Sequence, residues 1–318
     1  MQGWTLTWDR GRAVVTPAGA MLHHLTFDLG NGRSVAPFAE AAWHDEPEIQ
    51  GDETLAQHLR LLGGEWACVP FGTTQIDPGH HGYGSNAEWE LVEDGEGTIH
   101  LACAFPAGHP VERLERRIRG VPGKAAVEFS LRVVTRIDCA LPIGLHPIFK
   151  LPETTGTLHL EPAPFERGQV FPEPFQPGVS RLATGSLFSR LDAVDTLDGE
   201  PVSLAALPAP GLFEELVQLW KLEGSIALRD ETAGTRVRFE WDKGAFPHCL
   251  LWISQAGRTA KPWNGRFRGL GIEPVASAFD RTDLLDGSFS REGVSQPFRA
   301  GEPWDTRYRI SAEALASA

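Results

Sequence analysis

The sequence predicts an all-β fold built from antiparallel sheets, and three observations carry this prediction. Apolar residues alternate with polar ones over several stretches, and a period of two residues is typical of a half-buried strand. Glycine (34 residues) and proline (24 residues) exceed their average shares, which indicates many tight turns between short strands. Helical periodicity is nearly absent, so parallel sheets with crossover helices are not expected.

From the N-terminus, the first predicted element is the one helix. Over residues 54–62, Leu55, Leu59 and Leu62 recur at helical spacing. Gly63 follows at a position where glycine commonly ends a helix.

Strands follow, separated by turn signals. Asp-Gly-Glu-Gly at 94–97 and Pro-Gly at 122–123 are such signals. In the strand predicted at 127–133, Val, Phe, Leu and Val alternate with Glu, Ser and Arg. The same alternation predicts strands at 237–241 and 307–310, each with one face toward solvent.

One domain is expected across residues 1–318. The proline-rich stretch 161–178 is the one candidate linker. Strand patterns are alike on both sides of it, so we expect this stretch to wrap the surface of a single sandwich.

Composition limits the classes of partner. The formal net charge of −13 argues against nucleic acid, because phosphate binding requires clustered Lys and Arg. No apolar stretch is long enough to cross a bilayer, and the N-terminus has no basic segment followed by an apolar one. Four widely spaced cysteines resemble small buried residues in a reducing compartment: Cys68, Cys103, Cys139 and Cys249. We expect a cytoplasmic protein without a membrane partner; the oligomeric state is left open.

Two titratable residues stand out because each interrupts an apolar, strand-like run. His146 lies in the run at 144–151, and Glu273 lies in the run at 269–274. Burying such groups without a partner is costly, so a chain that keeps them there usually has a use for them. An imidazole and a carboxylate in these positions can serve as an acid and a base that face a common cleft.

Three segments in this order resemble the aldose 1-epimerase (galactose mutarotase) superfamily. They are HGYGSNAEWE at 81–90, HPIFKL at 146–151 and GLGIEP at 269–274. Each motif alone is weak, but the three agree in order and spacing, and the resemblance spans nearly the whole chain. It implies an antiparallel β-supersandwich with a sugar cleft on one sheet, and an isomerase that interconverts the anomers of a small sugar.

The resemblance also implies roles for residues. Opening a pyranose ring requires a proton delivered to the ring oxygen and a proton removed from the anomeric hydroxyl. His146 is the expected acid, since an imidazole has an ordinary pKa near 6.5, and Glu273 is the expected base. No cofactor and no metal are expected.

Four further residues are expected to bind the sugar. His81 and Asn86 belong to the first motif, and His81 would hydrogen-bond sugar hydroxyls or the ring oxygen. Glu215 matches an acidic binding residue of the family, usually Asp, and a shift of this match by one residue stays open. Trp263 could stack on a face of the sugar.

The chain departs from the family's known branches at three places. Ser85 stands where the hexose-6-phosphate branch has an arginine, and Thr73 follows a Pro-Phe-Gly turn where that branch has another. Residues 63–68 lack the arginine that binds substrate in the galactose branch. The missing phosphate-binding arginines favour an unphosphorylated aldose.

Other interpretations remain open at this point. A non-catalytic carbohydrate-binding protein could use the same cleft, and a lyase-like or hydrolase activity could occupy the same sandwich. Each singled-out residue could also be structural: Glu273 could pair with Arg266 or Arg268, and Trp263 could pack in the core. Asp77, His80 and His81 lie close in sequence, but their spacing matches no zinc pattern.

Overall fold

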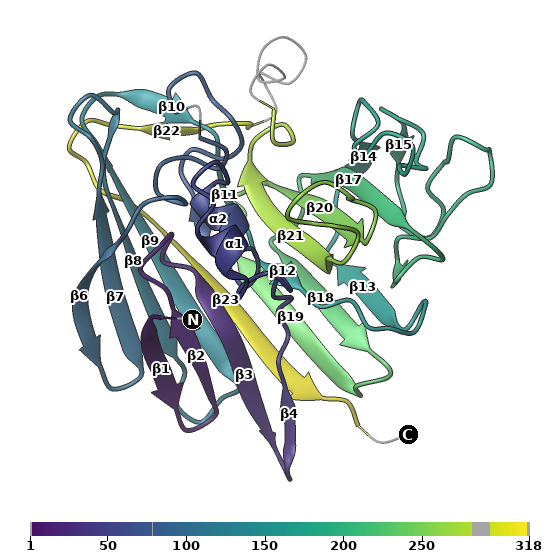
Figure 1. The fold of residues 1–318 in the computed structure, drawn as a ribbon, viewed down its shortest axis with the longest axis horizontal. Coiled ribbons are helices and arrows are strands. Elements are labelled where there is room, and N and C mark those ends of the chain that lie inside the picture. The colour runs from purple at the N-terminus through teal and green to yellow at the C-terminus, as the bar shows by residue number, and fades with distance from the viewer. Residues whose placement is uncertain (1, 78, 282–292, 317–318) are drawn as a thin grey trace.

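The computed structural model describes residues 2–77, 79–281 and 293–316, and strands dominate these residues (Figure 1). Within the described ranges, the named strands form two large sheets and two small ones. Every pairing between these strands is antiparallel. The all-β, antiparallel prediction is therefore confirmed.

The larger sheet contains nine strands among the described residues. In spatial order they are β16 (Ala206–Leu207), β13 (Leu158–Pro162), β18 (Ser225–Asp230), β19 (Thr235–Trp241), β23 (Trp304–Ala314), β9 (Ala126–Thr135), β8 (Val111–Gly120), β7 (Thr98–Ala104) and β6 (Glu90–Gly95). The strands predicted at 127–133, 237–241 and 307–310 lie in β9, β19 and β23, which are neighbours in this sheet.

The second large sheet contains eight strands in the described part of the chain. Its order is β15 (Leu187–Phe188), β14 (Arg167–Val170), β17 (Phe213–Trp220), β20 (His248–Gln255), β21 (Arg268–Ala276), β11 (Ile143–Leu145) and β5 (Ala67–Cys68), and β12 (Ile148–Phe149) pairs with β21. The segments that carry His146 and Glu273 are thus adjacent, because both β11 and β12 pair with β21.

The smaller elements lie beside these sheets (Figure 1). One small sheet contains β1 (Trp4–Trp8), β2 (Gly11–Val15), β3 (Leu22–Gly30) and β4 (Arg33–Val35), and the other pairs β10 (Cys139–Leu141) with β22 (Gln296–Phe298). The described helices are single turns, α1 (Pro47–Gln50) and α2 (Gln57–Arg60). The helix predicted at 54–62 is therefore too long. Thr54 donates hydrogen bonds from its N–H and hydroxyl to Asp52, which holds the preceding residues in a turn.

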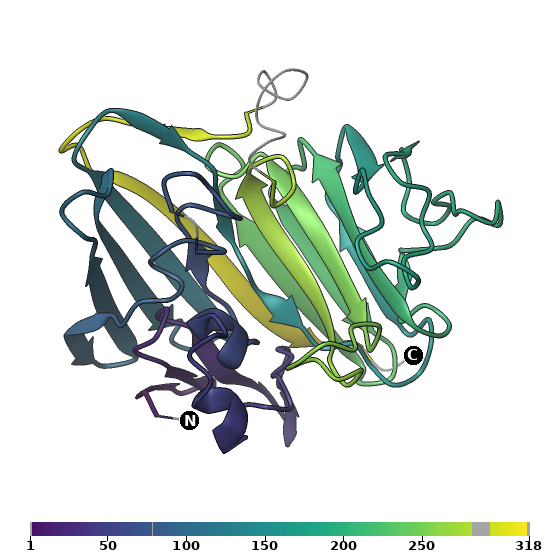
Figure 2. The ribbon, with the colours of Figure 1, turned by 45° about the horizontal axis from the view of Figure 1, so that its top comes forward.

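The main hydrophobic core lies between the two large sheets, and in Figure 2 the eight-stranded sheet partly overlaps the nine-stranded sheet. Alternate residues of each sheet meet there, among them Phe129 and Leu131 of β9 and Val217 and Leu219 of β17. The alternation that predicts the strands therefore also predicts which of their side chains point into this core.

A second hydrophobic layer covers the other face of the eight-stranded sheet. In β17 and β20, the residues that alternate with the core residues belong to this layer, including Leu216, Leu250 and Trp252. Trp43 and Trp66 pack against them from the chain that precedes β6. The central strands are consequently buried on both faces.

A buried polar cluster joins the nine-stranded sheet to residues beside β5. Arg116 of β8 donates hydrogen bonds to Glu65 Oε2 (2.6 Å), to Tyr308 Oη (2.7 Å) and to the carbonyl of Ala20 (2.6 Å). Tyr308 in turn donates to Glu65 Oε1 (2.8 Å). The side chains of Arg116 and Glu65 are fully buried, so each charge depends on the other for its stabilisation.

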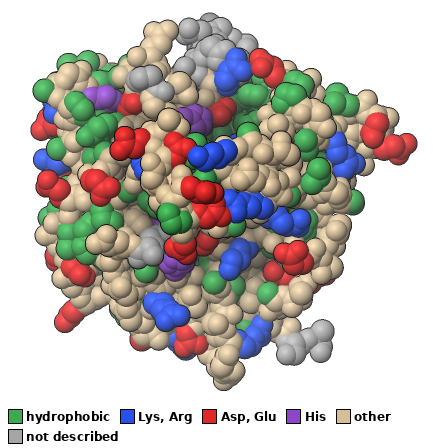
Figure 3. Space-filling model, viewed as in Figure 1, with side chains coloured by type: hydrophobic (Ala, Val, Ile, Leu, Met, Phe, Trp, Pro, Cys, Tyr) green, Lys and Arg blue, Asp and Glu red, His purple; other side chains and the backbone are tan. Residues whose placement is uncertain are grey.

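The surface mixes both signs of charge. On the face drawn in Figure 3, acidic and basic side chains are interspersed, so the net negative charge is not gathered into one patch there. Among the described residues, no helix combines the length and hydrophobicity that crossing a membrane requires.

Candidate active site

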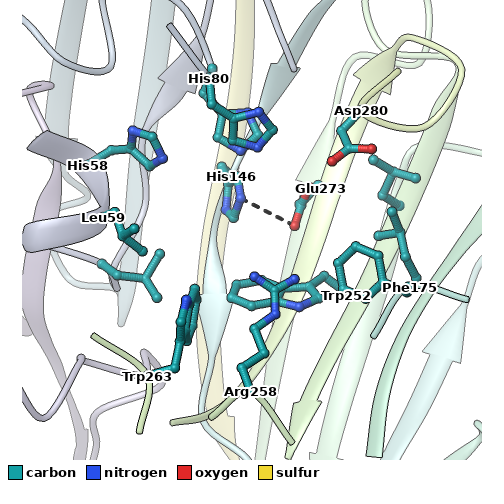
Figure 4. A pocket seen from close by; sticks show the side chains of 14 residues that line it. His58, Leu59, His80, His146, Phe175, Trp252, Arg258, Trp263, Glu273 and Asp280 are labelled. Atoms are coloured by element: carbon teal, nitrogen blue, oxygen red, sulfur yellow. Dashed lines mark ion pairs between the residues drawn. The ribbon is translucent and has the colours of Figure 1, made fainter. Parts of the chain in front are cut away.

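A cavity of about 250 Å³ opens beside the second hydrophobic layer of the eight-stranded sheet. Four histidines lie around it, His58, His80, His81 and His146. Glu273, Asp280 and Arg258 supply carboxyl and guanidinium groups, and the remaining lining is mainly apolar and aromatic (Figure 4). A few polar groups converging in an apolar hollow are typical of a small-molecule site.

His146 and Glu273 meet at this cavity. His146 Nε2 lies 3.4 Å from Glu273 Oε1, and both side chains are more than nine-tenths buried (Figure 4). The imidazole stacks on the indole of Trp66, with ring centroids 4.1 Å apart and planes inclined by 11°. Gly271 leaves room for the carboxyl group, because a β-carbon there would overlap Glu273 Oε1. The stacking positions the imidazole, and the missing β-carbon leaves space for the carboxyl group beside it.

Burial shifts both groups toward their neutral forms. Burial raises the pKa of Glu273 well above its ordinary value, and the nearby Asp280 carboxylate raises it further, while Arg258 opposes the shift. Burial lowers the pKa of His146 well below its ordinary value, and the neighbouring His58 and His80 lower it further. These directions favour a pair that holds one proton between the carboxyl group and the imidazole.

His81 faces His146 edge-on, with ring centroids 4.9 Å apart. Its backbone is left-handed, with φ of 61°, and its Nδ1 accepts a hydrogen bond from the N–H of Gly72 (3.4 Å). Since Nδ1 is an acceptor, the ring proton lies on Nε2. Burial lowers the pKa of His81 well below its usual range, so the ring is a neutral hydrogen-bond donor.

Asn86 lies outside the cavity, next to a residue that lines it. It is not among the residues that line the cavity. Its Oδ1 accepts a hydrogen bond from His58 Nδ1 (2.9 Å), and its amide group donates to the carbonyls of His80 and Gly82. The structure therefore places Asn86 where it orients His58.

Aromatic rings and one arginine form the opposite wall. Trp263 and Trp252 line the cavity with their rings edge to face, and their centroids are 5.7 Å apart. The Arg258 guanidinium lies 4.7 Å from the Trp263 ring and 5.3 Å from the Trp252 ring. Its Nε is 3.6 Å from Oε2 of Glu214. Arg258 thus lies over two aromatic rings and pairs with a buried carboxyl group.

Glu215 is not brought to the cavity. Its carboxyl group accepts hydrogen bonds from the backbone N–H groups of Arg181 and Leu182, and burial raises its pKa to about 7. Successive residues of a strand point to opposite faces. Glu214 therefore shares the face of Leu216, which lines the cavity, and Glu215 lies on the opposite face.

Several residues of the site escape the sequence prediction. Arg258, His58 and Asp280 lie in loops or in a short helical turn, where no periodicity marks them. Glu214 could have been found, because the alternation along 213–220 separates it from Glu215. Asp77 and His80 interact with different partners: Asp77 faces His109 (3.5 Å), and His80 contacts Thr73 (3.0 Å).

Comparison with known proteins identifies the fold. No model of a protein family matches the chain, and no curated protein matches it. Solved structures do match. A protein from Synechocystis sp. PCC 6803 superposes with a TM-score of 0.68 at 14% identity, covering 98% of this chain and 96% of that one. A candidate aldose 1-epimerase from Escherichia coli K12 gives 0.68 and 14%, covering 99% of both chains.

A galactose mutarotase related enzyme from Lactobacillus acidophilus gives a TM-score of 0.63 at 14% identity and covers 99% of both chains. At 14% identity these similarities show the fold alone. The fold is the galactose mutarotase-like β-sandwich, as the sequence motifs imply.

Proposed function

We propose that this chain is an aldose 1-epimerase, which interconverts the α and β anomers of an unphosphorylated aldose. One observation carries the proposal: His146 and Glu273, from two adjacent segments of one sheet, meet 3.4 Å apart at a cavity. An acid and a base at this separation can reach two oxygens bonded to the same carbon, which is the geometry that anomer exchange requires.

The pair can catalyse ring opening whether its one proton lies on His146 or on Glu273. With the proton on His146, Glu273 removes the proton of the anomeric hydroxyl while His146 protonates the ring oxygen. With the proton on Glu273, the two roles are exchanged. In both cases the bond between the anomeric carbon and the ring oxygen breaks, and an open-chain aldehyde forms. Rotation about the adjacent carbon–carbon bond and reclosure give the other anomer. On reclosure the base returns its proton to the aldehyde oxygen, and the acid recovers a proton from the hydroxyl at the former ring oxygen, so the pair holds one proton throughout.

The surrounding residues fit an uncharged sugar. Trp252 and Trp263 line the cavity with aromatic rings that sugar C–H groups can contact. His81 offers a neutral N–H, and Arg258 offers guanidinium N–H groups for hydroxyls. Carboxyl groups surround Arg258, because Glu214, Asp280 and Glu273 all interact with its charge. A doubly charged phosphate would be repelled by these groups, so their presence supports an unphosphorylated substrate.

The size of the cavity supports a single sugar ring. Its volume of about 250 Å³ falls just below the range of roughly 300–1,000 Å³ that is typical of small-molecule sites. An oligosaccharide would need a longer groove. This observation favours the epimerase over a hydrolase or lyase acting on polymers.

Anomer exchange on a panel of about ten free aldoses tests the proposal, because few contacts decide sugar specificity. Each sugar is dissolved as one anomer, and polarimetry or NMR exchange follows the approach to equilibrium with and without the protein. We expect acceleration for at least one aldose. Saturable binding without acceleration would instead support the carbohydrate-binding protein, and release of reducing ends from oligosaccharides would support a hydrolase.

The register of β17 predicts different effects for two neighbouring glutamates. Glu214→Gln removes the buried carboxylate that pairs with Arg258 at 3.6 Å. It is expected to raise KM about tenfold, which corresponds to about 1.4 kcal/mol of lost binding. Glu215→Gln keeps an oxygen that can accept both backbone N–H groups, so KM should change less than about twofold. Steady-state kinetics on the aldose found in the panel measures both. A larger effect at Glu215 would reinstate the role implied by the family resemblance.

A further inference from the structure

A group of metal-ligating side chains lies outside the sugar cavity. His23 of β3 and Glu40 and His44 from the segment before α1 bring one ligand atom each to within 4.8 Å of one another. His23 Nδ1 is 2.7 Å from Glu40 Oε2, and His44 Nδ1 is 3.8 Å from the same oxygen. None of the three lines the sugar cavity.

The hydrogen bonds of His44 fix which of its nitrogens carries the proton. His44 Nε2 lies 2.9 Å from the carbonyl of Leu61 and 3.1 Å from that of Leu62. Carbonyl oxygens only accept, so Nε2 donates and the lone pair of the neutral ring lies on Nδ1. This lone pair faces the Glu40 carboxylate. Two acceptors in this arrangement repel each other unless a proton or a cation lies between them, and histidines that bind metals commonly donate their other N–H to a carbonyl.

His23 directs one ring nitrogen toward Glu40 and leaves the other without a partner among the described residues. Its side chain is fully buried, and within the described residues its Nε2 has no hydrogen-bond partner. With Nδ1 taken up by Glu40, every protonation state of the ring leaves a buried nitrogen unsatisfied. An ion at Nδ1 would leave Nε2 unsatisfied as well, so the converging ligand atoms and the lone pair of His44, rather than this nitrogen, point to an ion.

We propose that His23 Nδ1, His44 Nδ1 and the Glu40 carboxylate bind a divalent first-row metal ion, for which Zn²⁺ is the best match. Two imidazoles and one carboxylate are a ligand set that zinc accepts, with bonds of about 2.0–2.2 Å. Side-chain movements of about 1 Å or less would bring atoms now within 4.8 Å to that geometry. A fourth ligand is available from solvent, since 21% of the Glu40 side chain is exposed. No metal is expected from the sequence, and this site is a proposal that departs from that expectation.

Such an ion would tie β3 to one wall of the sugar cavity. Trp43 lies between Glu40 and His44 in sequence, donates to the carbonyl of Leu59 (2.9 Å) and packs against Trp263 with ring centroids 5.3 Å apart. Leu59 and Trp263 both line the cavity. The proposed role is therefore structural, and it holds whether or not the protein exchanges anomers.

Zinc binding to the chelator-treated full chain tests the site by titration calorimetry. We expect one Zn²⁺ per chain and a higher Tm at saturation. Glu40→Gln should weaken binding at least about 100-fold, because loss of even a residue that only orients a ligand costs 10–100-fold. Glu115→Gln is the matched control. Glu115 is 20% exposed and pairs with His100 at 3.1 Å, but in the described part of the chain it belongs to no group of three potential metal ligands. This control should bind zinc as the unchanged protein does.

Cobalt provides a measurement on the unchanged protein. Co²⁺ in the site should give the intense visible absorption of a four-coordinate ion, and Zn²⁺ should displace it with unit stoichiometry. X-ray absorption of the zinc-loaded protein should show two imidazoles bound to the ion even if Glu40→Gln fails to fold. Absence of stoichiometric binding, equal binding by Glu40→Gln, or a zinc ion without imidazole ligands would each overturn the proposal.

Discussion

Glu273→Gln is expected to lower kcat/KM for anomer exchange by about 10²–10⁴-fold, the contribution typical of a positioned acid or base. Glutamine keeps the size of the side chain but can neither take a proton from the anomeric hydroxyl nor deliver one to the ring oxygen. Stopped-flow polarimetry on the best aldose of the panel measures the change. Glu115→Gln, a like substitution in the nine-stranded sheet, should retain full activity, and circular dichroism verifies that both variants fold.

The pH dependence of kcat/KM in Glu273→Gln distinguishes loss of the catalytic carboxyl group from a general loss of structure. At low pH the pair takes up a second proton, on His146, and kcat/KM falls. Because the pKa of His146 is lowered, this acid limb of the profile lies below pH 6.5. The pair loses its last proton through the raised pKa of Glu273, so the basic limb lies above pH 4.5. In Glu273→Gln the limb set by the carboxyl group should vanish, which leaves only the titration of His146. Unchanged kcat/KM in the variant would refute the assigned pair.

Arg116→Met is expected to lower the free energy of unfolding by about 3–5 kcal/mol, the range found when one partner of a buried ion pair is removed. The substitution keeps an apolar side chain of similar length but leaves Glu65 buried without its cation. Tyr308 would still donate to Glu65, which is too little to replace a charge. Urea unfolding followed by tryptophan fluorescence measures the difference.

Two further variants make this result specific. Arg119 lies on the same strand and pairs with Glu128, but the side chains are 53% and 35% exposed. Arg119→Met should therefore change the free energy of unfolding by less than about 1 kcal/mol. Adding Glu65→Gln to Arg116→Met should recover part of the loss, because the uncompensated charge is then gone. Equal losses at both arginines would show that burial of the pair is not the cause.

The fold is largely readable from the sequence because its information is local. Alternation in residues 127–133 fixes both the strand and the face that Phe129 and Leu131 turn to the core. The helical spacing of Leu55, Leu59 and Leu62 is misleading, since helix propensity over so few residues cannot outweigh the turn at Asp52.

The site is only partly readable. His146 and Glu273 can be picked out because polar groups in apolar strands are unusual, and the structure brings both to one cavity. Arg258 is invisible in the sequence, because a loop positions it and aromatic rings from other segments orient it. The His23, Glu40 and His44 group depends likewise on a tertiary contact between β3 and the segment before α1.

The histidines around the cavity carry a consequence for behaviour in acid. Burial lowers the pKa of His58 to about 4, and His81 and His146 shift in the same direction. Once the chain opens, these rings regain ordinary proton affinity, so below pH 6.5 the unfolded form takes up protons that the native form refuses. Each ring can then remove up to about 1.4 kcal/mol of stability per pH unit. Acidification is therefore expected to lower the stability of the fold through the same imidazoles that line its cavity.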